Sequence, residues 1–129
     1  MISFQAFRQT DGTPIYLQII RYIQQGLAAG TIRDGDELPS RRVVSALLAV
    51  NPNTVQKAFR LLEDEGLVTS RAGAKSYIQA TPEQIAALRR ALLETEMQAM
   101  VDAARRMGLT REEAHRLLDT LYDKEGTDA

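Results

Sequence analysis

Apolar residues recur at spacings of three and four in five stretches of the chain, as they do on one face of an α-helix. The first stripe ends before Gly30, a typical helix end, and consists of Ile15, Ile19, Tyr22, Ile23 and Leu27. Together the stripes predict helices over residues 14–29, 41–50, 52–65, 82–107 and 111–124. Each helix is preceded by a residue able to cap its free amides: Thr13, Ser40, Asn51, Thr81 and Thr110.

The segment before the first helix does not follow the helical period. Ile2 and Phe4 alternate with polar residues ahead of an Asp11-Gly12 turn. We expect an extended arm that docks either on the body of the domain or on a partner subunit. Residues 31–39 are expected to hold a turn and a very short strand.

The middle of the chain predicts a winged helix-turn-helix. Asn51-Pro52 opens the third helix only three residues after Leu48, and two helices joined by so short a turn are typical of this motif. Residues 67–70 and 76–79 read as the strands of a hairpin around a polar tip at 71–75, which is the wing. The predicted fold is therefore mainly α with a small β-hairpin wing, followed by a C-terminal two-helix hairpin.

The C-terminal hairpin carries more apolar side chains than two helices can hide against each other. We expect its long first helix to pack against the same element of a second copy in a two-fold homodimer. The residues expected in this interface are Leu88, Leu92, Met100, Leu117 and Leu121. The alternative is a monomer in which the hairpin folds back on the winged-helix domain.

These elements divide the chain into four predicted parts. They are an N-terminal arm at 1–13, a winged helix-turn-helix domain at 14–80, a helical dimerisation hairpin at 81–125 and a frayed tail at 126–129.

Composition narrows the function classes. The 129 residues contain no cysteine, which excludes disulfides and thiolate ligands and fits a cytoplasmic location. No stretch reaches the roughly 20 apolar residues that span a bilayer, so no membrane partner is expected. The net charge of −1 hides a division, because residues 1–80 carry +2 and the remainder carries −3.

The sequence offers no catalytic constellation. His115 is the only histidine and lies beside the apolar stripe of the last helix, where a surface position is expected. Glu63, Asp64 and Glu65 follow one another on a helix, so their carboxylates point in different directions and predict a solvated helix end rather than a metal site. We expect no enzyme, no metal and no cofactor, and the sequence identifies no small-molecule effector.

The third predicted helix carries the functional signal. Its outward positions are Asn53, Thr54, Gln56, Lys57 and Arg60. Asn and Gln side chains pair with adenine edges, and Lys and Arg reach guanine or phosphate. The same residues would also suit a solvent-facing helix surface, and the neighbouring turn and basic hairpin favour DNA.

Three runs of residues resemble the GntR family of bacterial transcription regulators. They are Leu38-Pro39-Ser40-Arg41-Arg42, Val50-Asn51-Pro52-Asn53-Thr54-Val55-Gln56-Lys57-Ala58-Phe59, and Leu62-Glu63-Asp64-Glu65-Gly66-Leu67-Val68. The opening Pro14-Ile15-Tyr16-Leu17-Gln18-Ile19 and the short helical tail are similar to the YtrA subfamily.

This resemblance implies a set of DNA contacts. Beside Arg41, which we expect on a phosphate, they are Arg42, Asn51, Asn53, Thr54, Gln56, Lys57, Arg71, Gly73 and Lys75. Two departures from the family pattern matter. Gly73-Ala74-Lys75 replaces the usual Gly-x-Gly of the wing, and Pro52 stands where other subfamilies have a base-reading arginine. Base recognition therefore shifts to Asn53 and Gln56.

The resemblance implies a transcriptional repressor that binds double-stranded DNA at an inverted-repeat operator. YtrA-like proteins often accompany genes for ABC transporters, so control of such an operon is implied as well. The alternative is a winged-helix adaptor that docks another protein. An adaptor should present an apolar or acidic outward face on the third helix, and here that face is polar and basic.

Overall fold

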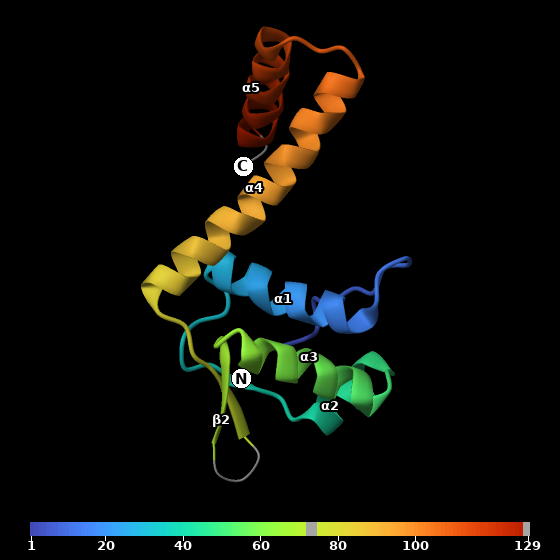
Figure 1. Cartoon of the computed structure of the whole chain (residues 1–129), viewed down its shortest axis with the longest axis vertical. Helices are drawn as coiled ribbons and strands as arrows, with labels where there is room; N and C mark the ends of the chain where they lie inside the picture. The colour runs from blue at the N-terminus through green and yellow to red at the C-terminus, as the bar shows by residue number, and fades with distance from the viewer. Residues whose placement is uncertain (72–74, 128–129) are drawn as a thin grey trace. The chain divides into compact units, whose positions relative to one another are not determined.

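The computed structural model describes the backbone of residues 1–71 and 75–127, with the side chains of these residues up to Lys124 (Figure 1). The chain forms two compact units, Met1–Arg90 and Ala91–Ala129. This division falls inside a helix, whereas the predicted domain boundary lies earlier, at the start of that helix. In chain order the elements are α1 Ile15–Ala29, β1 Glu37–Leu38, α2 Arg41–Leu48, α3 Pro52–Asp64, β2 Val68–Arg71, β3 Lys75–Ile78, α4 Pro82–Arg106 and α5 Arg111–Thr127.

The core of the first unit lies where α1 packs against α3 (Figure 1). The apolar stripe predicted for α1 supplies Ile19, Ile23 and Leu27, each at most 1% exposed. The facing stripe of α3 consists of Val55, Ala58, Phe59 and Leu62, which are buried to the same degree. Because both stripes are buried against each other, the rotation of α3 about its own axis is fixed. The opposite face of α3 therefore points outward.

Four of the five predicted helix caps are present. Ser40 Oγ accepts from the Val43 amide at 3.1 Å, and Asn51 Oδ1 accepts from the Asn53 amide at 2.8 Å. The caps Thr81 and Thr110 of α4 and α5 complete reciprocal capping boxes with Gln84 and Glu113.

The cap predicted at Thr13 is wrong. Pro14 itself occupies the N-cap position of α1, with a ψ of 138° and no side-chain cap. The Gln18 amide instead donates to the Thr13 carbonyl at 2.8 Å, and Gln18 also exchanges two hydrogen bonds with the Thr10 backbone. The turn ahead of α1 is therefore held from inside the helix.

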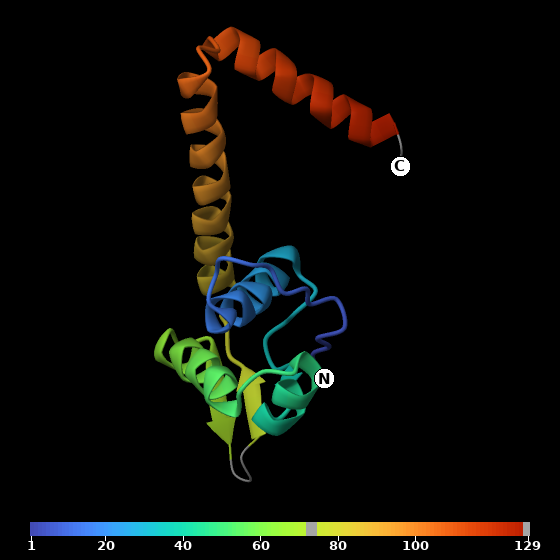
Figure 2. The ribbon, with the colours of Figure 1, turned by 90° about the vertical axis from the view of Figure 1, so that its right-hand side faces the viewer.

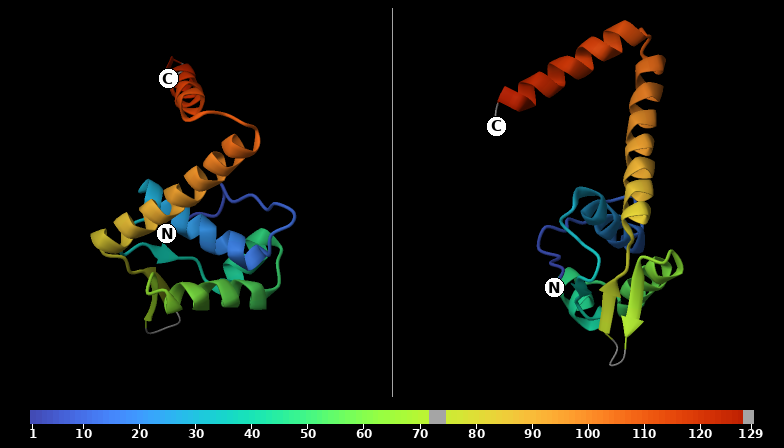
Figure 3. Two further views of the ribbon diagram at one scale, coloured as in Figure 1. Left: turned by 45° about the horizontal axis from the view of Figure 1, so that its top comes forward. Right: turned by 90° about the vertical axis from the view of Figure 1, so that its left-hand side faces the viewer.

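The sheet has three antiparallel strands in the order β1-β3-β2. Glu37 of β1 pairs with Tyr77 of β3, which confirms the very short strand expected in this region. β2 and β3 form the predicted hairpin, with Val68 opposite Ile78, and lie side by side (Figure 3). Both strands are shifted by one residue toward the tip relative to the prediction.

The N-terminal arm docks on the body of its own chain. Ile2, Phe4 and Phe7 are buried in the core of the first unit, and the Ile2 amide donates to the Glu37 carbonyl at 2.8 Å. The Phe4 and Phe7 rings pack around Tyr22, whose hydroxyl donates to the Ser3 carbonyl. The sequence left open whether the arm docks on the body of the domain or on a partner subunit, and the structure shows the body of the domain.

The second unit consists of the C-terminal part of α4, a connection around Gly108, and α5. The two helices diverge from this connection (Figure 2). Their apolar side chains therefore stay exposed: Leu93, Met97, Met100, Val101, Met107, Leu117, Leu121 and Tyr122. α5 continues to Thr127, so residues 126 and 127 are helical rather than part of the predicted frayed tail; residues 128–129 lie outside the described part.

None of the helices in the described part of the chain has the length and apolarity needed to cross a bilayer.

Candidate nucleic-acid interface

The outward face of α3 is polar and exposed. Asn53, Gln56, Lys57 and Arg60 are exposed, and Thr54 is half-buried. Their spacing along the helix places them opposite the buried stripe that anchors α3 to α1. The face therefore combines two amide side chains with two cations on a rigid element, which is the chemistry that reads base edges and binds phosphates.

The turn between α2 and α3 sets the position of this face. Ala49 ends α2 with φ 55°, in the left-handed region that residues other than glycine rarely adopt. The Ser45 hydroxyl donates to the Val50 carbonyl at 2.6 Å, and the Val50 amide donates to the Ser45 carbonyl at 3.1 Å. Gln9 of the N-terminal arm donates to the Leu48 carbonyl at 2.8 Å. The arm thus satisfies a backbone group that the end of a helix leaves free.

The N-cap of α3 restricts what Asn51 offers to DNA. Its Oδ1 already accepts from the Asn53 amide. The side-chain amide hydrogens of Asn51 stay available for a phosphate or a base, and Oδ1 keeps one lone pair for a base donor. Asn53 lies two residues further along the chain and is exposed. Its side chain holds no hydrogen bond among the described residues.

The two arginines at the start of α2 differ in their surroundings. Arg42 is exposed. Arg41 lies with one guanidinium nitrogen 3.5 Å from Glu63 Oε1, and its guanidinium carbon is 5.6 Å from the centre of the Phe59 ring. Because Arg41 faces Glu63 through one guanidinium nitrogen, its predicted phosphate contact falls to its other N–H donors, whereas the Arg42 side chain is exposed.

Glu63 is only partly solvated at the helix end that the sequence predicts to be exposed. Its side chain is 33% exposed and accepts from the Ser70 hydroxyl at 2.8 Å in addition to pairing with Arg41. It therefore connects α2, α3 and β2. The sequence does not indicate these contacts, because the partners of Glu63 come from other elements. Asp64 and Glu65 are exposed as expected.

Two further cations of the interface lie over tyrosine rings. Lys57 Nζ is 4.0 Å from the centre of the Tyr16 ring, and the guanidinium carbon of Arg71 is 4.5 Å from the centre of the Tyr77 ring. The sequence pattern predicts a functional role for neither tyrosine. No local pattern marks them, because each ring meets its cation only through tertiary packing or strand pairing.

The wing places two basic side chains opposite each other. Arg71 of β2 pairs in register with Lys75 of β3, and both are exposed. Gly73, predicted to approach DNA through its backbone, lies outside the described residues.

The residues expected in a dimer interface fall into two groups. Leu88 is half-buried and packs against the core of the first unit, and Leu92 is also half-buried. Met100, Leu117 and Leu121 are each about half exposed in the second unit. The residues predicted for the dimer interface therefore differ in their surroundings along α4, because Leu88 packs within the first unit.

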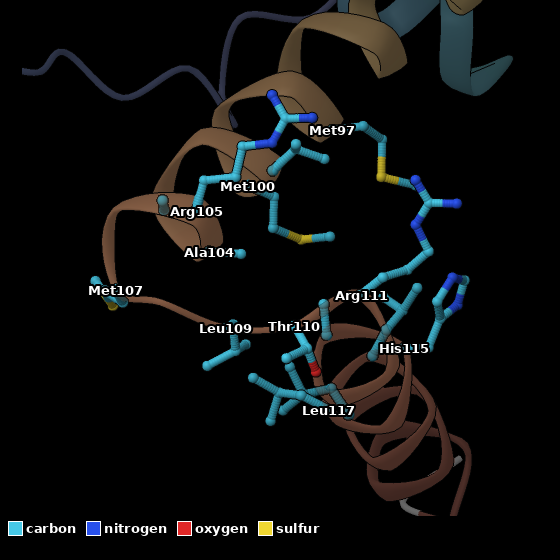
Figure 4. A pocket seen from close by; sticks show the side chains of 15 residues that line it. Met97, Met100, Ala104, Arg105, Met107, Leu109, Thr110, Arg111, His115 and Leu117 are labelled. Carbon is cyan, nitrogen blue, oxygen red and sulfur yellow. The ribbon is translucent and has the colours of Figure 1, made fainter.

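Met100, Leu117 and Leu121 line an apolar pocket of about 660 Å³ between the end of α4 and α5 (Figure 4). Arg105, Arg111 and His115 also border it. His115 is exposed, as the sequence predicted.

Comparisons with known proteins agree with this geometry. The model of the "Bacterial regulatory proteins, gntR family" matches residues 15–78, from α1 through β3. The chain is 41% identical over 68 residues to the HTH-type transcriptional repressor YtrA of Bacillus subtilis (strain 168), a match that covers 53% of this chain and 52% of YtrA. The alignment thus spans about half the length of that relative.

A second relative is matched over most of its length. The uncharacterized HTH-type transcriptional regulator YhcF of Bacillus subtilis (strain 168) is 35% identical over 100 residues, which cover 78% of this chain and 83% of YhcF.

A solved GntR family transcriptional regulator from Listeria monocytogenes superposes with a TM-score of 0.79 at 27% identity. This match covers 87% of this chain and 98% of the Listeria chain. The matched family model, the similarity to two HTH-type regulators and this shared fold lead to one conclusion. The chain belongs to the GntR family of bacterial DNA-binding transcriptional regulators, and its similarity to YtrA places it in the YtrA subfamily.

Proposed function

We propose that the chain is a cytoplasmic transcriptional repressor that binds an inverted-repeat operator as a homodimer. The observation that carries this proposal is the outward face of α3, which presents Asn53, Gln56 and Lys57 from a helix locked by its buried side. The exposed Arg42 on α2 and the basic wing flank the same helix in sequence. An adaptor for another protein would not need this combination of amides and cations.

Contacts to DNA divide by chemistry. We assign the phosphate contacts to the exposed cations Arg42, Lys57, Arg71 and Lys75. Arg41 is a further phosphate contact, through the guanidinium N–H donors that do not face Glu63. The base contacts fall to the amide side chains of Asn53 and Gln56, and each good pair with a base contributes about 1–3 kcal/mol to discrimination.

The exposed apolar side chains of the second unit support a homodimer. A face with this many large apolar residues marks an interaction surface, and a symmetric operator requires two copies of α3. Two-fold pairing would cover Met100, Leu117 and Leu121 and set the recognition helices on half-sites about one helical turn, roughly 34 Å, apart.

The target genes are proposed from the similarity to the YtrA subfamily and from no feature of the site. Because YtrA-like regulators often accompany ABC-transporter genes, we propose such an operon as the target.

The proposal is tested by selecting duplexes from a random-sequence pool with the full-length chain and titrating the enriched duplex by fluorescence anisotropy. A scrambled duplex of the same composition is the reference. We expect two protomers per duplex, a preference of at least about 10³-fold over the scrambled duplex, and a steep loss of affinity with salt. A pool without any enriched sequence would contradict the proposal.

Two variants distinguish base recognition from phosphate binding. Gln56→Ala should reduce the preference for the enriched duplex by about 1–3 kcal/mol and leave the affinity for the scrambled duplex nearly unchanged. Lys57→Ala should weaken both duplexes by the same factor and lower the salt slope by about 0.9. Equal losses on both duplexes for both variants would contradict this division.

A further inference from the structure

One cation of the DNA-binding face is held by an aromatic ring from another helix. Tyr16 lies in the first turn of α1, where it is half-buried and packs against the core. Lys57 is exposed in the middle of α3, and its Nζ lies 4.0 Å from the centre of the Tyr16 ring. An ammonium this close to a ring face is attracted by the negative face of the π-system.

The two partners have different mobility. The Tyr16 ring belongs to the packed junction of α1 with α3, so its position is set by the core. Lysine carries its charge on four methylene groups and loses much rotamer freedom when it is fixed. The ring therefore selects one direction for the Lys57 side chain, toward the first turn of α1.

We propose that Tyr16 is a positioning residue of the DNA interface, whose ring holds the Lys57 ammonium in place for a phosphate at the edge of the groove that α3 enters. This inference rests on the proposed function, because it requires α3 to dock on duplex DNA. The ring covers one side of the ammonium, and N–H donors on the other side stay free for a phosphate oxygen. Ordering Lys57 before DNA arrives lowers the entropy lost on binding.

The proposal concerns the ring face and not the hydroxyl of Tyr16. Tyr16→Phe keeps the ring and removes the hydroxyl, whereas Tyr16→Leu keeps an apolar side chain and removes the ring. The two variants therefore separate cation positioning from simple packing. Tyr16→Met fills the same space without a ring and takes the place of Tyr16→Leu should that variant melt below the assay temperature.

The test is a fluorescence-anisotropy titration of the full-length variants against two duplexes, the enriched operator and a scrambled one. We expect Tyr16→Phe to bind both like the wild type and Tyr16→Leu to bind both about two- to fivefold more weakly. In the Lys57→Ala background, Tyr16→Leu should cause no further loss. The salt slope of Tyr16→Leu should move from the wild-type value toward that of Lys57→Ala.

Arg60 provides a matched control. It is an exposed cation one turn further along α3, with no aromatic partner among the described residues. The losses from Tyr16→Leu and Arg60→Ala should multiply in the double variant, as for independent sites.

Three results would overturn the inference: wild-type or tighter binding by Tyr16→Leu, an equal loss in Tyr16→Phe, or a full further loss in the Lys57→Ala background. A missing preference for the operator counts against the proposed function instead. The Lys57 contact is to the backbone and is measured equally well on the scrambled duplex.

Discussion

Ala49 shows how a single residue can carry strain in the turn that orients α3. Its φ of 55° costs an alanine roughly 1–2 kcal/mol relative to its ordinary conformation, and a glycine adopts it freely. Glycine gives back part of this gain through the larger entropy of the unfolded chain. We expect Ala49→Gly to raise the free energy of unfolding by about 0.5 kcal/mol in urea denaturation.

The control for this prediction lies in the preceding helix. Ala46 is exposed in the interior of α2, where glycine is unfavourable. Ala46→Gly should lower the free energy of unfolding by about 1 kcal/mol. A destabilising Ala49→Gly would contradict the argument from the backbone angle.

Glu63 connects three elements through its carboxylate, which suggests a measurable effect on stability. Glu63→Gln keeps the shape and a possible acceptor for Ser70 but removes the charge that faces Arg41. Because the pair is about one-third exposed, we expect a loss of only about 0.5–1 kcal/mol in the free energy of unfolding. Asp64→Asn makes the same charge change at an exposed neighbour and should stay within about 0.5 kcal/mol of wild type. Equal effects of the two variants would argue against the connecting role of Glu63.

The contacts of several single residues could not be predicted from the sequence. Arg41 and Arg42 are adjacent and chemically identical, and only the tertiary approach of Glu63 distinguishes them. Phe7 enters the core without a periodic partner, so the pattern of the arm did not indicate it. The tyrosine rings beside Lys57 and Arg71 are equally invisible, because those contacts join distant turns and paired strands.

Helices and strands were far more predictable than these contacts. Caps and apolar stripes are local, so Asn51-Pro52 and the boxes at Thr81 and Thr110 placed the starts of α3, α4 and α5 correctly. Thr13 was the exception among the caps, since Gln18 reaches back over the turn and Pro14 takes the cap position. The wing followed from its turn and strand pattern.

The start of α5 makes a prediction about pH. Hydrogen bonds from the Thr110 backbone amide and then from its hydroxyl hold the pKa of Glu113 below the ordinary glutamate value. Because the pKa is lower in the folded chain, the carboxylate stabilises this helix start at neutral pH. The contribution is lost as the pH falls through the folded pKa.

An NMR titration of the Glu113 carboxyl group should therefore show a midpoint below that of an unstructured glutamate. Thr110→Val removes the hydroxyl but keeps the amide, so the pKa of Glu113 should rise part of the way back. An ordinary pKa in the wild type would contradict the capping box.

At the scale of the whole molecule, the proposed dimer rests on the apolar face of the second unit. The stripes of α4 and α5 predicted a partner, but a stripe alone does not say whether its cover comes from the same chain. In the structure these helices diverge and leave Leu117 and Leu121 about half exposed. That exposure favours a second copy as the cover.

Leu121→Glu should therefore convert the dimer into a monomer in analytical ultracentrifugation, because a charge would be buried in an apolar interface. Operator affinity should fall by about 100-fold once the two recognition helices are no longer linked. Leu47→Glu, at an exposed leucine of α2 in the first unit, should stay dimeric. A dimeric Leu121→Glu variant would place the interface elsewhere.

In the proposed complex, two copies of α3 enter successive major grooves of a symmetric site. Hydroxyl-radical footprinting of the full-length chain on its enriched duplex measures this arrangement. We expect two protected segments related by a dyad, with centres about 10 base pairs apart or a multiple of that spacing. A single asymmetric protected segment, or protection that is the same on the scrambled duplex, would contradict it.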